Sequence, residues 1–131
     1  MSKQVINISD VKKSSTGFNH VVKAGDFIFL SSQLSTDLKT GEIIPGEIKQ
    51  QTIKTMENIK YLLSHCHCSM DDIVKIVIYF RHPKDRSAIN EVYKQYFTRG
   101  QEPAKISIQA ASPIEGIDVE IEATAFTLHT S

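Results

Sequence analysis

The sequence has little of several features that mark common protein classes. It contains two cysteines, Cys66 and Cys68, no tryptophan, and no apolar run near the roughly 20 residues that a transmembrane helix needs. Cysteines two positions apart are badly placed to bridge each other, which favours a reducing compartment. The first ten residues also lack the apolar core of a signal peptide. We therefore expect a cytoplasmic protein with no membrane partner.

Net charge is absent as well, because 15 basic and 15 acidic residues cancel. A protein that binds nucleic acid by neutralising phosphates needs a basic stripe, so a nucleic-acid partner is not expected. The chain has 131 residues, of which 40% are hydrophobic and 23% are charged, as in ordinary globular proteins. This length fits one domain spanning residues 1–131, large enough to bury a core without disulfides or metal ions.

Hydrophobic periodicity predicts an α+β domain with the element order β-β-β-α-β-α-β-β. Two helices then cover one face of a mainly antiparallel six-stranded sheet. The other face keeps apolar side chains, which favours a partner subunit as its cover. The expected strands are 4–8, 20–23, 27–31, 73–80, 105–111 and 118–128, and the expected helices are 47–65 and 85–100.

Local signals refine this prediction. Residues 24–26, Ala-Gly-Asp, form a natural hairpin turn. The run at 73–80 is nearly continuous in β-branched and aromatic residues, which is typical of a strand buried on both faces. Asp85 is placed to cap the second helix, and Gly100 to close it.

A polar pattern near the end of the chain is the most specific local feature. Lys105, Ser107 and Gln109 share one strand face, and Glu120 and Glu122 share one face of the next strand. If these two strands pair, Lys105 and Glu120 come within reach of each other. The pair then forms either a surface salt bridge or an anion-binding cation beside a carboxylate that handles water.

Other candidate sites are weaker. The run His65-Cys66-His67-Cys68 suggests a metal site, but neighbours two positions apart diverge on a helix and no second ligand cluster follows. A core position for Cys66 is the better interpretation, and no metal is expected. The side chain of Asn90 can cap, hydrogen-bond a loop or face a cleft, and the residues alone do not decide between these.

Several short segments occur in an order and at spacings that are specific when taken together. They are Leu30-Ser31-Ser32-Gln33, 39–42, 51–58, 72–75, 89–93, Phe97, Pro103-Ala104-Lys105 and 119–123. Together they span nearly the whole chain and resemble the YjgF/RidA family of enamine/imine deaminases, whose members are also described as L-PSP endoribonucleases.

The resemblance implies a chorismate-mutase-like fold and a homotrimer with three clefts between neighbouring subunits. It also implies a ligand class, small 2-imino acids or the corresponding 2-keto acids. Active members of the family hydrolyse the imino acids to 2-keto acids and ammonia without a cofactor.

Some of the family's functional residues are matched in this sequence and others are replaced. Glu120 matches a glutamate that orients the attacking water, and Lys105 stands where the family arginine grips the substrate carboxylate, so these two are the expected catalytic residues. The expected substrate-binding residues are Phe18 in place of a tyrosine, Ser31, Ser32 in place of a glycine, Gln33, Asn90, and Ser107 in place of cysteine or threonine.

Lysine keeps the positive charge of arginine but loses its planar fork. The resemblance therefore leaves two readings: a weak or altered imine deaminase, and a trimer that binds small carboxylates for regulation without deaminating them. An endoribonuclease or translation inhibitor is less favoured, because the charge is balanced and the sequence has no exposed aromatic and basic strip.

Overall fold

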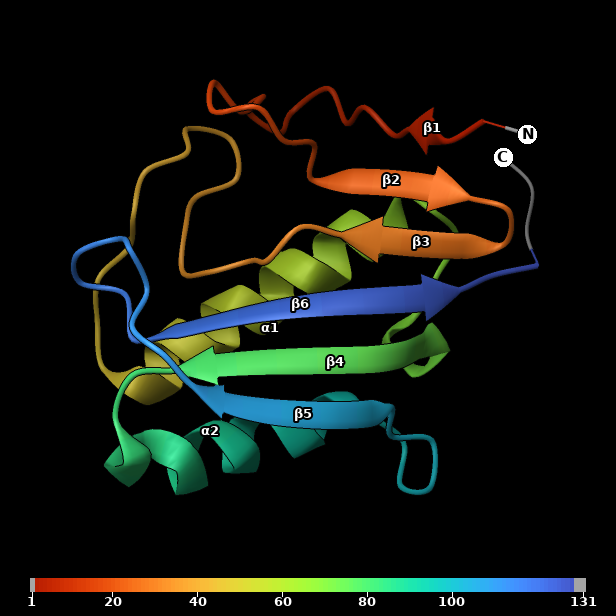
Figure 1. Cartoon of the computed structure of the whole chain (residues 1–131). Coiled ribbons are helices and arrows are strands. Elements are labelled where there is room, and N and C mark those ends of the chain that lie inside the picture. Colours follow the sequence, from red (N-terminus) through yellow and green to blue (C-terminus); the bar gives the residue numbers. More distant parts are fainter. Residues whose placement is uncertain (1, 129–131) are drawn as a thin grey trace.

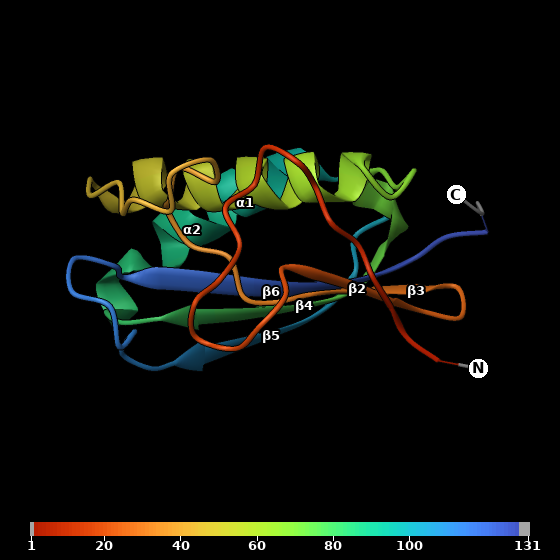
Figure 2. The same cartoon turned by 90° about the horizontal axis from the view of Figure 1, so that it is seen from above.

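The computed structural model describes residues 2–128. Its six strands form one sheet in the order β1-β2-β3-β6-β4-β5, and both helices lie on one face of that sheet (Figures 1 and 2). The α+β class and the predicted order of elements are confirmed. The elements are β1 Gln4–Val5, β2 Val21–Ala24, β3 Phe27–Leu30, α1 Ile48–Ser64, β4 Ile73–Phe80, α2 Arg86–Tyr93, β5 Ala104–Gln109 and β6 Val119–Phe126.

The predicted turn joins β2 to β3. Ala24 pairs with Phe27 across an antiparallel ladder, so two residues, Gly25 and Asp26, make the connection. Gly25 has φ +59°, a backbone angle that glycine adopts without steric cost. The first strand, β1, is shorter than predicted and ends at Val5.

Helix α1 follows the predicted bounds closely and supplies the core. Its apolar residues recur every three or four positions, so one stripe of the helix faces the sheet. Met56, Ile59, Leu62 and Leu63 on this stripe are fully buried. They belong to the same core cluster as Ile76, Ile78 and Ile121 of the sheet.

Helix α2 is shorter than predicted, and two of its predicted signals are wrong. Asp85 makes no capping hydrogen bond, because it ends a 3-10 turn, Pro83–Asp85, and already has helical angles (φ −88°, ψ −10°). A second 3-10 turn, Lys94–Tyr96, ends the helical segment. Gly100, with φ +93°, lies in a later turn.

The position of β5 corrects the predicted pairing of the last two strands. β5 pairs only with β4, in parallel, whereas β6 lies between β3 and β4 and is antiparallel to both. The cause is α2, since a helical crossover returns the chain parallel to the strand that it left. β5 is therefore an edge strand, and β4 separates it from β6 (Figure 1).

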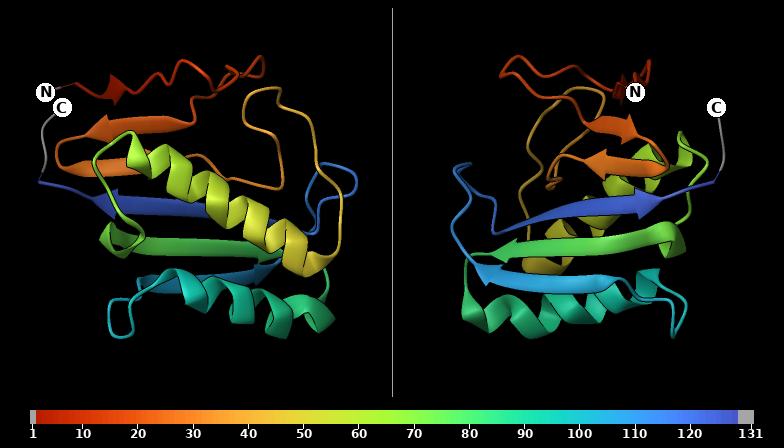
Figure 3. Two further views of the ribbon diagram at one scale, coloured as in Figure 1. Left: turned by 180° about the vertical axis from the view of Figure 1, so that it is seen from behind. Right: turned by 45° about the vertical axis from the view of Figure 1, so that its right-hand side comes forward.

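One face of the sheet carries no helix among residues 2–128 (Figure 3). β4 is therefore fully buried on the helix side only. Val77 and Tyr79, which face the open side, are only partly buried, so the predicted burial on both faces does not hold within one chain. Apolar side chains are spread over this open face: Phe27, Phe29, Ile106, Ile108 and Phe126. None of the helices in the described part of the chain is long and apolar enough to cross a lipid bilayer.

Candidate functional site

Glu120 is the centre of the candidate site. It alternates along β6 with Val119 and Ile121, which are buried beneath the helices, so its side chain projects on the open face. Its Oε1 accepts a hydrogen bond of 3.1 Å from Ser32 Oγ, and its Oε2 accepts one from Ser112 Oγ. Two hydroxyl donors therefore hold one carboxylate in a fixed orientation.

A cavity of about 330 Å³ opens beside this carboxylate. Ser32, Ser112 and Glu120 line it together with Tyr79 and Glu122. The Tyr79 hydroxyl donates a hydrogen bond of 2.6 Å to Glu122 Oε1, and this bond is the main cause that raises the pKa of Tyr79. The cavity therefore combines hydroxyl donors with carboxylates, which suits handling water and a polar small molecule.

A second cavity, of about 260 Å³, meets the first at Ser32. Phe18, His20 and Gln33 line it. Gln33 is buried, and its Nε2 donates to Ser31 O at 3.1 Å and contacts His20 Nδ1 at 3.2 Å. Burial lowers the pKa of His20, so at neutral pH its neutral ring can accept the Gln33 amide hydrogen at Nδ1.

Ser31 lies beside this group without facing the carboxylate. Its hydroxyl donates a hydrogen bond of 2.6 Å to the carbonyl oxygen of Asn19. The bond ties the end of β3 to the segment that carries Phe18. Ser31 thus positions the wall of the second cavity.

Lys105 lies in a different group, under α2. Its ammonium Nζ donates to Asn90 Oδ1 at 2.6 Å and sits 4.5 Å from the centroid of the Tyr93 ring. Burial lowers the pKa of Lys105, and the nearby positive charge of Arg86 lowers it further. Ser107 is two residues along β5 on the same face. This group concentrates positive charge at an edge of the sheet.

The predicted contact between Lys105 and Glu120 does not occur within the chain. Lys105 pairs with Ile76 of β4, which faces the helices, whereas Glu120 pairs with Tyr79, which faces the open side. The two side chains therefore lie on opposite faces of the sheet, with β4 between their strands. The predicted site residues divide into a Glu120 group (Phe18, Ser31, Ser32, Gln33, Glu120) and a Lys105 group (Asn90, Lys105, Ser107).

Comparison with known proteins decides the family. The family profile described as endoribonuclease L-PSP matches residues 9–127. A RutC family protein of Pyrococcus abyssi is 35% identical over 126 residues, which cover 96% of this chain and 98% of the relative. The chain belongs to the YjgF/RidA family.

Two further relatives have a named activity or a bound ligand of their own. A Capra hircus protein named 2-iminobutanoate/2-iminopropanoate deaminase is 30% identical over 123 residues, covering 94% of this chain and 89% of the relative. The crystal structure of E. coli TdcF with bound serine has a TM-score of 0.83 and 30% identity, and the match covers 94% of this chain and 98% of TdcF.

The sequence patterns do not identify several residues of this candidate site. Ser112, which donates to Glu120, lies in an irregular loop with no motif to mark it. Tyr79 belongs to a run that predicts only a strand. Tyr93 is a buried residue of α2, and its ring also carries the Lys105 ammonium. Only long-range contacts reveal these roles.

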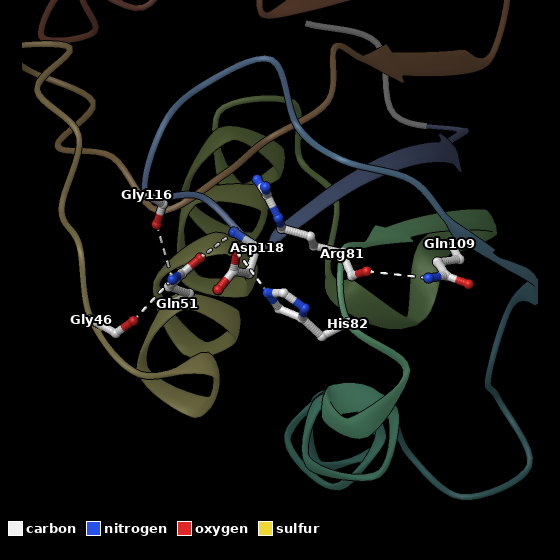
Figure 4. A network of polar contacts seen from close by, with 7 residues as sticks. All are labelled: Gly46, Gln51, Arg81, His82, Gln109, Gly116 and Asp118. Carbon is white, nitrogen blue, oxygen red and sulfur yellow. Dashed lines mark hydrogen bonds and ion pairs between the residues drawn. The ribbon is translucent and has the colours of Figure 1, made fainter.

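The loop before β6 is tied to α1 by a buried glutamine (Figure 4). Gln51 Nε2 donates to the carbonyl oxygens of Gly46 at 2.9 Å and Gly116 at 3.2 Å, while Gln51 Oε1 accepts from Asp118 N at 2.9 Å. His82 Nε2 lies 3.8 Å from Asp118 Oδ1. These contacts fix the loop that leads into Glu120.

The His-Cys-His-Cys run has no role in this site. Cys66 is buried in the core, as predicted, and both Cys66 and Cys68 are free thiols. Burial raises the pKa of Cys66 to about 11, which makes it a poor metal ligand and nucleophile at neutral pH. Within residues 2–128 no group of histidine, cysteine, aspartate and glutamate side chains is arranged to hold a metal ion.

Proposed function

We propose that this protein hydrolyses small reactive 2-imino acids to 2-keto acids and ammonia. The observation that carries the proposal is the Glu120 carboxylate, held by two hydroxyls at the wall of a cavity. Relatives named 2-iminobutanoate/2-iminopropanoate deaminase, at 28–30% identity, support the same chemistry. The reaction needs water and no cofactor.

In the proposed mechanism Glu120 acts as a general base. It takes a proton from a water molecule as the water oxygen bonds to the carbon of the protonated imine, giving a neutral carbinolamine. The protonated Glu120 then gives that proton to the carbinolamine nitrogen. As the carbon–nitrogen bond breaks and the keto group forms, the hydroxyl proton passes to the Glu120 carboxylate and leaves with ammonia as ammonium, which regenerates the base. Ser32 and Ser112 keep the carboxylate aimed during both steps.

The substrate carboxylate needs a cation, and we propose that Lys105 of a neighbouring subunit supplies it. Within one chain Lys105 lies on the wrong face of the sheet for Glu120, so a shared cleft is the arrangement that unites them. The apolar open face supports assembly of subunits, and the family resemblance implies a homotrimer. The positive charge of Arg86 beside Lys105 adds to the attraction for an anion.

The deciding experiment is an ammonia-release assay with freshly generated 2-iminobutanoate and 2-iminopropanoate. We expect hydrolysis above the uncatalysed rate, and we expect Glu120→Gln to abolish it because an amide cannot accept the proton. Glu115→Gln, an exposed loop substitution, is the matched control. If the wild-type protein releases ammonia no faster than the uncatalysed reaction, the proposal is wrong.

A second candidate function is a trimer that binds small carboxylates for regulation and does not deaminate them. The substitution of lysine for the family arginine at position 105 favours it, and so does the absence of a hydroxyl on Phe18. Binding of a 2-keto acid without any imine hydrolysis is its distinguishing result. An endoribonuclease is less favoured, because the chain has no excess of basic residues. The cytoplasm is the proposed location, where the two buried thiols stay reduced.

A further inference from the structure

The second cavity, which meets the Glu120 cavity at Ser32, has no role in the mechanism above. We infer that it receives the side chain of the substrate, and that the preferred substrates are 2-imino acids with a large apolar side chain, such as a branched aliphatic or phenyl group. The inference rests on the proposed function and names the substrate class of the same site.

The chemistry of the cavity wall supports an apolar occupant. Leu34, Leu38, Ile43 and Ile114 line it, and each is only partly buried by the rest of the chain. Covering such side chains with a hydrocarbon group removes apolar surface from water, which is the main source of small-molecule affinity in pockets. A methyl group, the side chain of 2-iminopropanoate, leaves most of this surface wet.

The size of the cavity points the same way. Its volume is about 260 Å³. An engineered protein cavity of about 150 Å³ already accommodates benzene. A phenyl or isobutyl group therefore fits, with room for the chain that links it to the imine carbon.

An aromatic residue stands at the mouth of the cavity. Phe18 is 46% exposed, and its ring packs edge to face against His20 with centroids 5.3 Å apart. Gln33, which is buried, holds the His20 ring at Nδ1. Phe18 stands where the family has a tyrosine, so this position adds an apolar ring and no hydroxyl to the wall.

The charged residues that line the cavity are Lys12, Lys13 and Asp37. Lys12 and Lys13 are exposed. The Lys12 stem runs across Gly41, with its Cδ 3.1 Å from the position that a Cβ on Gly41 would take. Asp37 Oδ1 is occupied by the backbone N–H groups of Lys39 at 2.8 Å and Thr40 at 3.3 Å. Because two exposed lysines line the cavity, a substrate with an acidic side chain is the main alternative occupant.

Ser32 fixes where the two parts of a substrate lie. Its hydroxyl is bonded to Glu120 and its residue lines both cavities. An imine carbon placed beside Glu120 is therefore next to the entrance of the second cavity. The substrate's side chain, which is bonded to the same carbon as its carboxylate, then enters the second cavity.

The test compares substrates and includes a binding measurement that does not depend on catalysis. Imines of alanine and leucine, generated in place by an amino acid oxidase, are assayed for ammonia release. In parallel, the dissociation constants of pyruvate, 2-oxoglutarate and 4-methyl-2-oxopentanoate are measured by NMR titration. We expect the leucine-derived imine and 4-methyl-2-oxopentanoate to be favoured over their small counterparts by about 10- to 100-fold.

A matched pair of variants locates the effect. Ile43→Asp places a charge on the cavity wall and is expected to reduce the preference to less than threefold. Its neighbour Ile44 is 40% exposed and does not line the cavity, so Ile44→Asp is expected to keep the wild-type preference. Circular dichroism checks that both variants are folded.

The outcomes separate the two claims. If no imine is hydrolysed, the proposed function is overturned. The ratio of keto-acid affinities then still tests whether the second cavity binds an apolar side chain. Equal affinities, tighter binding of 2-oxoglutarate than of 4-methyl-2-oxopentanoate, or an equal effect of Ile43→Asp and Ile44→Asp overturn the subsite. Absent binding of all three keto acids overturns it as well.

Discussion

At the scale of single residues, the exchange of arginine for lysine at position 105 matters most for activity. Lys105 is already committed to Asn90 Oδ1 at 2.6 Å and to the Tyr93 ring, so it has fewer free donors for a substrate than a guanidinium. Arginine has five donors in a rigid fork that matches a carboxylate. The present residue therefore supplies charge without full orientation.

We predict that Lys105→Arg raises the rate of imine hydrolysis by roughly tenfold or more, because one additional charge-assisted hydrogen bond stabilises the transition state by about 1.5–3 kcal/mol. Lys105→Ala lowers the rate further, since the carboxylate then has no counter-charge. The measurement is kcat/KM for ammonia release, with Lys60→Arg on the exposed side of α1 as control. An inactive Lys105→Arg protein would instead indicate chemistry by the lysine amine itself.

Cys66 carries a prediction about pH. Burial raises the pKa of its thiol from 9.0 to about 11, so the folded state favours the protonated form. Below pH 9 the thiol is protonated in both the folded and the unfolded chain, and its contribution to the free energy of unfolding is at its maximum. As the pH rises from 9 towards 11 the unfolded chain releases its proton first, and this stabilisation is lost.

We therefore expect the free energy of unfolding to fall between pH 9 and 11 in urea titrations, and to fall less in Cys66→Ala. Alkylation of Cys66 by iodoacetamide at pH 8 is expected to be slow until urea unfolds the chain, because only about one thiol in a thousand is ionised. Rapid alkylation of the native protein would contradict the burial argument.

Residue identities were predictable where a motif marked them. Glu120 and Lys105 stand at positions that the family resemblance identifies, and their identities alone suggest a base and an anion-binding cation. Their faces were not predictable, because the parity of a side chain on a sheet depends on which strand pairs with which. Ser112 acquires its role only through a contact across a loop.

At the scale of elements, Gln51 of α1 joins three segments of the chain. Its side-chain amide donates hydrogen bonds to the carbonyl oxygens of Gly46 and Gly116 and accepts one from the N–H of Asp118 (Figure 4). Gln51 is buried, so water does not replace the amide easily once it is removed. The loop that leads into β6 thus depends on one side chain of a distant helix.

Gln51→Ala is predicted to lower the free energy of unfolding by roughly 2–4 kcal/mol, because it leaves buried donors and acceptors without partners. Gln109→Ala serves as control, since Gln109 is exposed and its Nε2 reaches Arg81 O only at 3.5 Å. It should change stability by less than about 0.5 kcal/mol. Urea denaturation followed by circular dichroism measures both, and equal losses would refute the role of Gln51.

The elements themselves were predictable because their signals are local. Spacings of three and four residues mark α1, and alternation marks β5 and β6. The order of the strands in the sheet was not predictable, because β6 inserts between β3 and β4 through long-range pairing that no local pattern marks. The end of α2 was misjudged because the chain tightens into a 3-10 turn before Gly100.

At the scale of the whole molecule, the open face of the sheet is the surface through which we expect subunits to assemble. We predict a trimer, with light scattering at micromolar concentration giving about three times 14.7 kDa. Ile106→Asp places a charge on this face, where Ile106 is 45% exposed, and is expected to yield monomers. Ile53→Asp, at a 46% exposed position on α1, should leave the trimer intact. A wild-type monomer contradicts both the trimer and the shared cleft.

Two impaired variants, Lys105→Ala and Glu120→Gln, should complement each other if the cleft is shared. Lys105→Ala and Glu120→Gln each remove one half of every cleft in their own trimers. A mixed trimer regains one cleft that joins an intact Lys105 to an intact Glu120, so random mixing restores about a quarter of the wild-type clefts. The measurement is ammonia release after the two proteins are unfolded together and refolded. Activity no higher than the sum of the separate variants argues that each site lies within one chain.

Under the proposed shared cleft, the placement of Lys105 and Glu120 on opposite faces of one sheet makes catalysis depend on protein concentration. A dissociated chain keeps its own Glu120 but lacks the Lys105 of a neighbouring subunit, which the proposal needs to hold a substrate. Halving the protein below the dissociation constant of the assembly then more than halves the rate. Under the same proposal, the expression level of the protein sets the rate of imine hydrolysis, and below a threshold concentration the protein is present without activity.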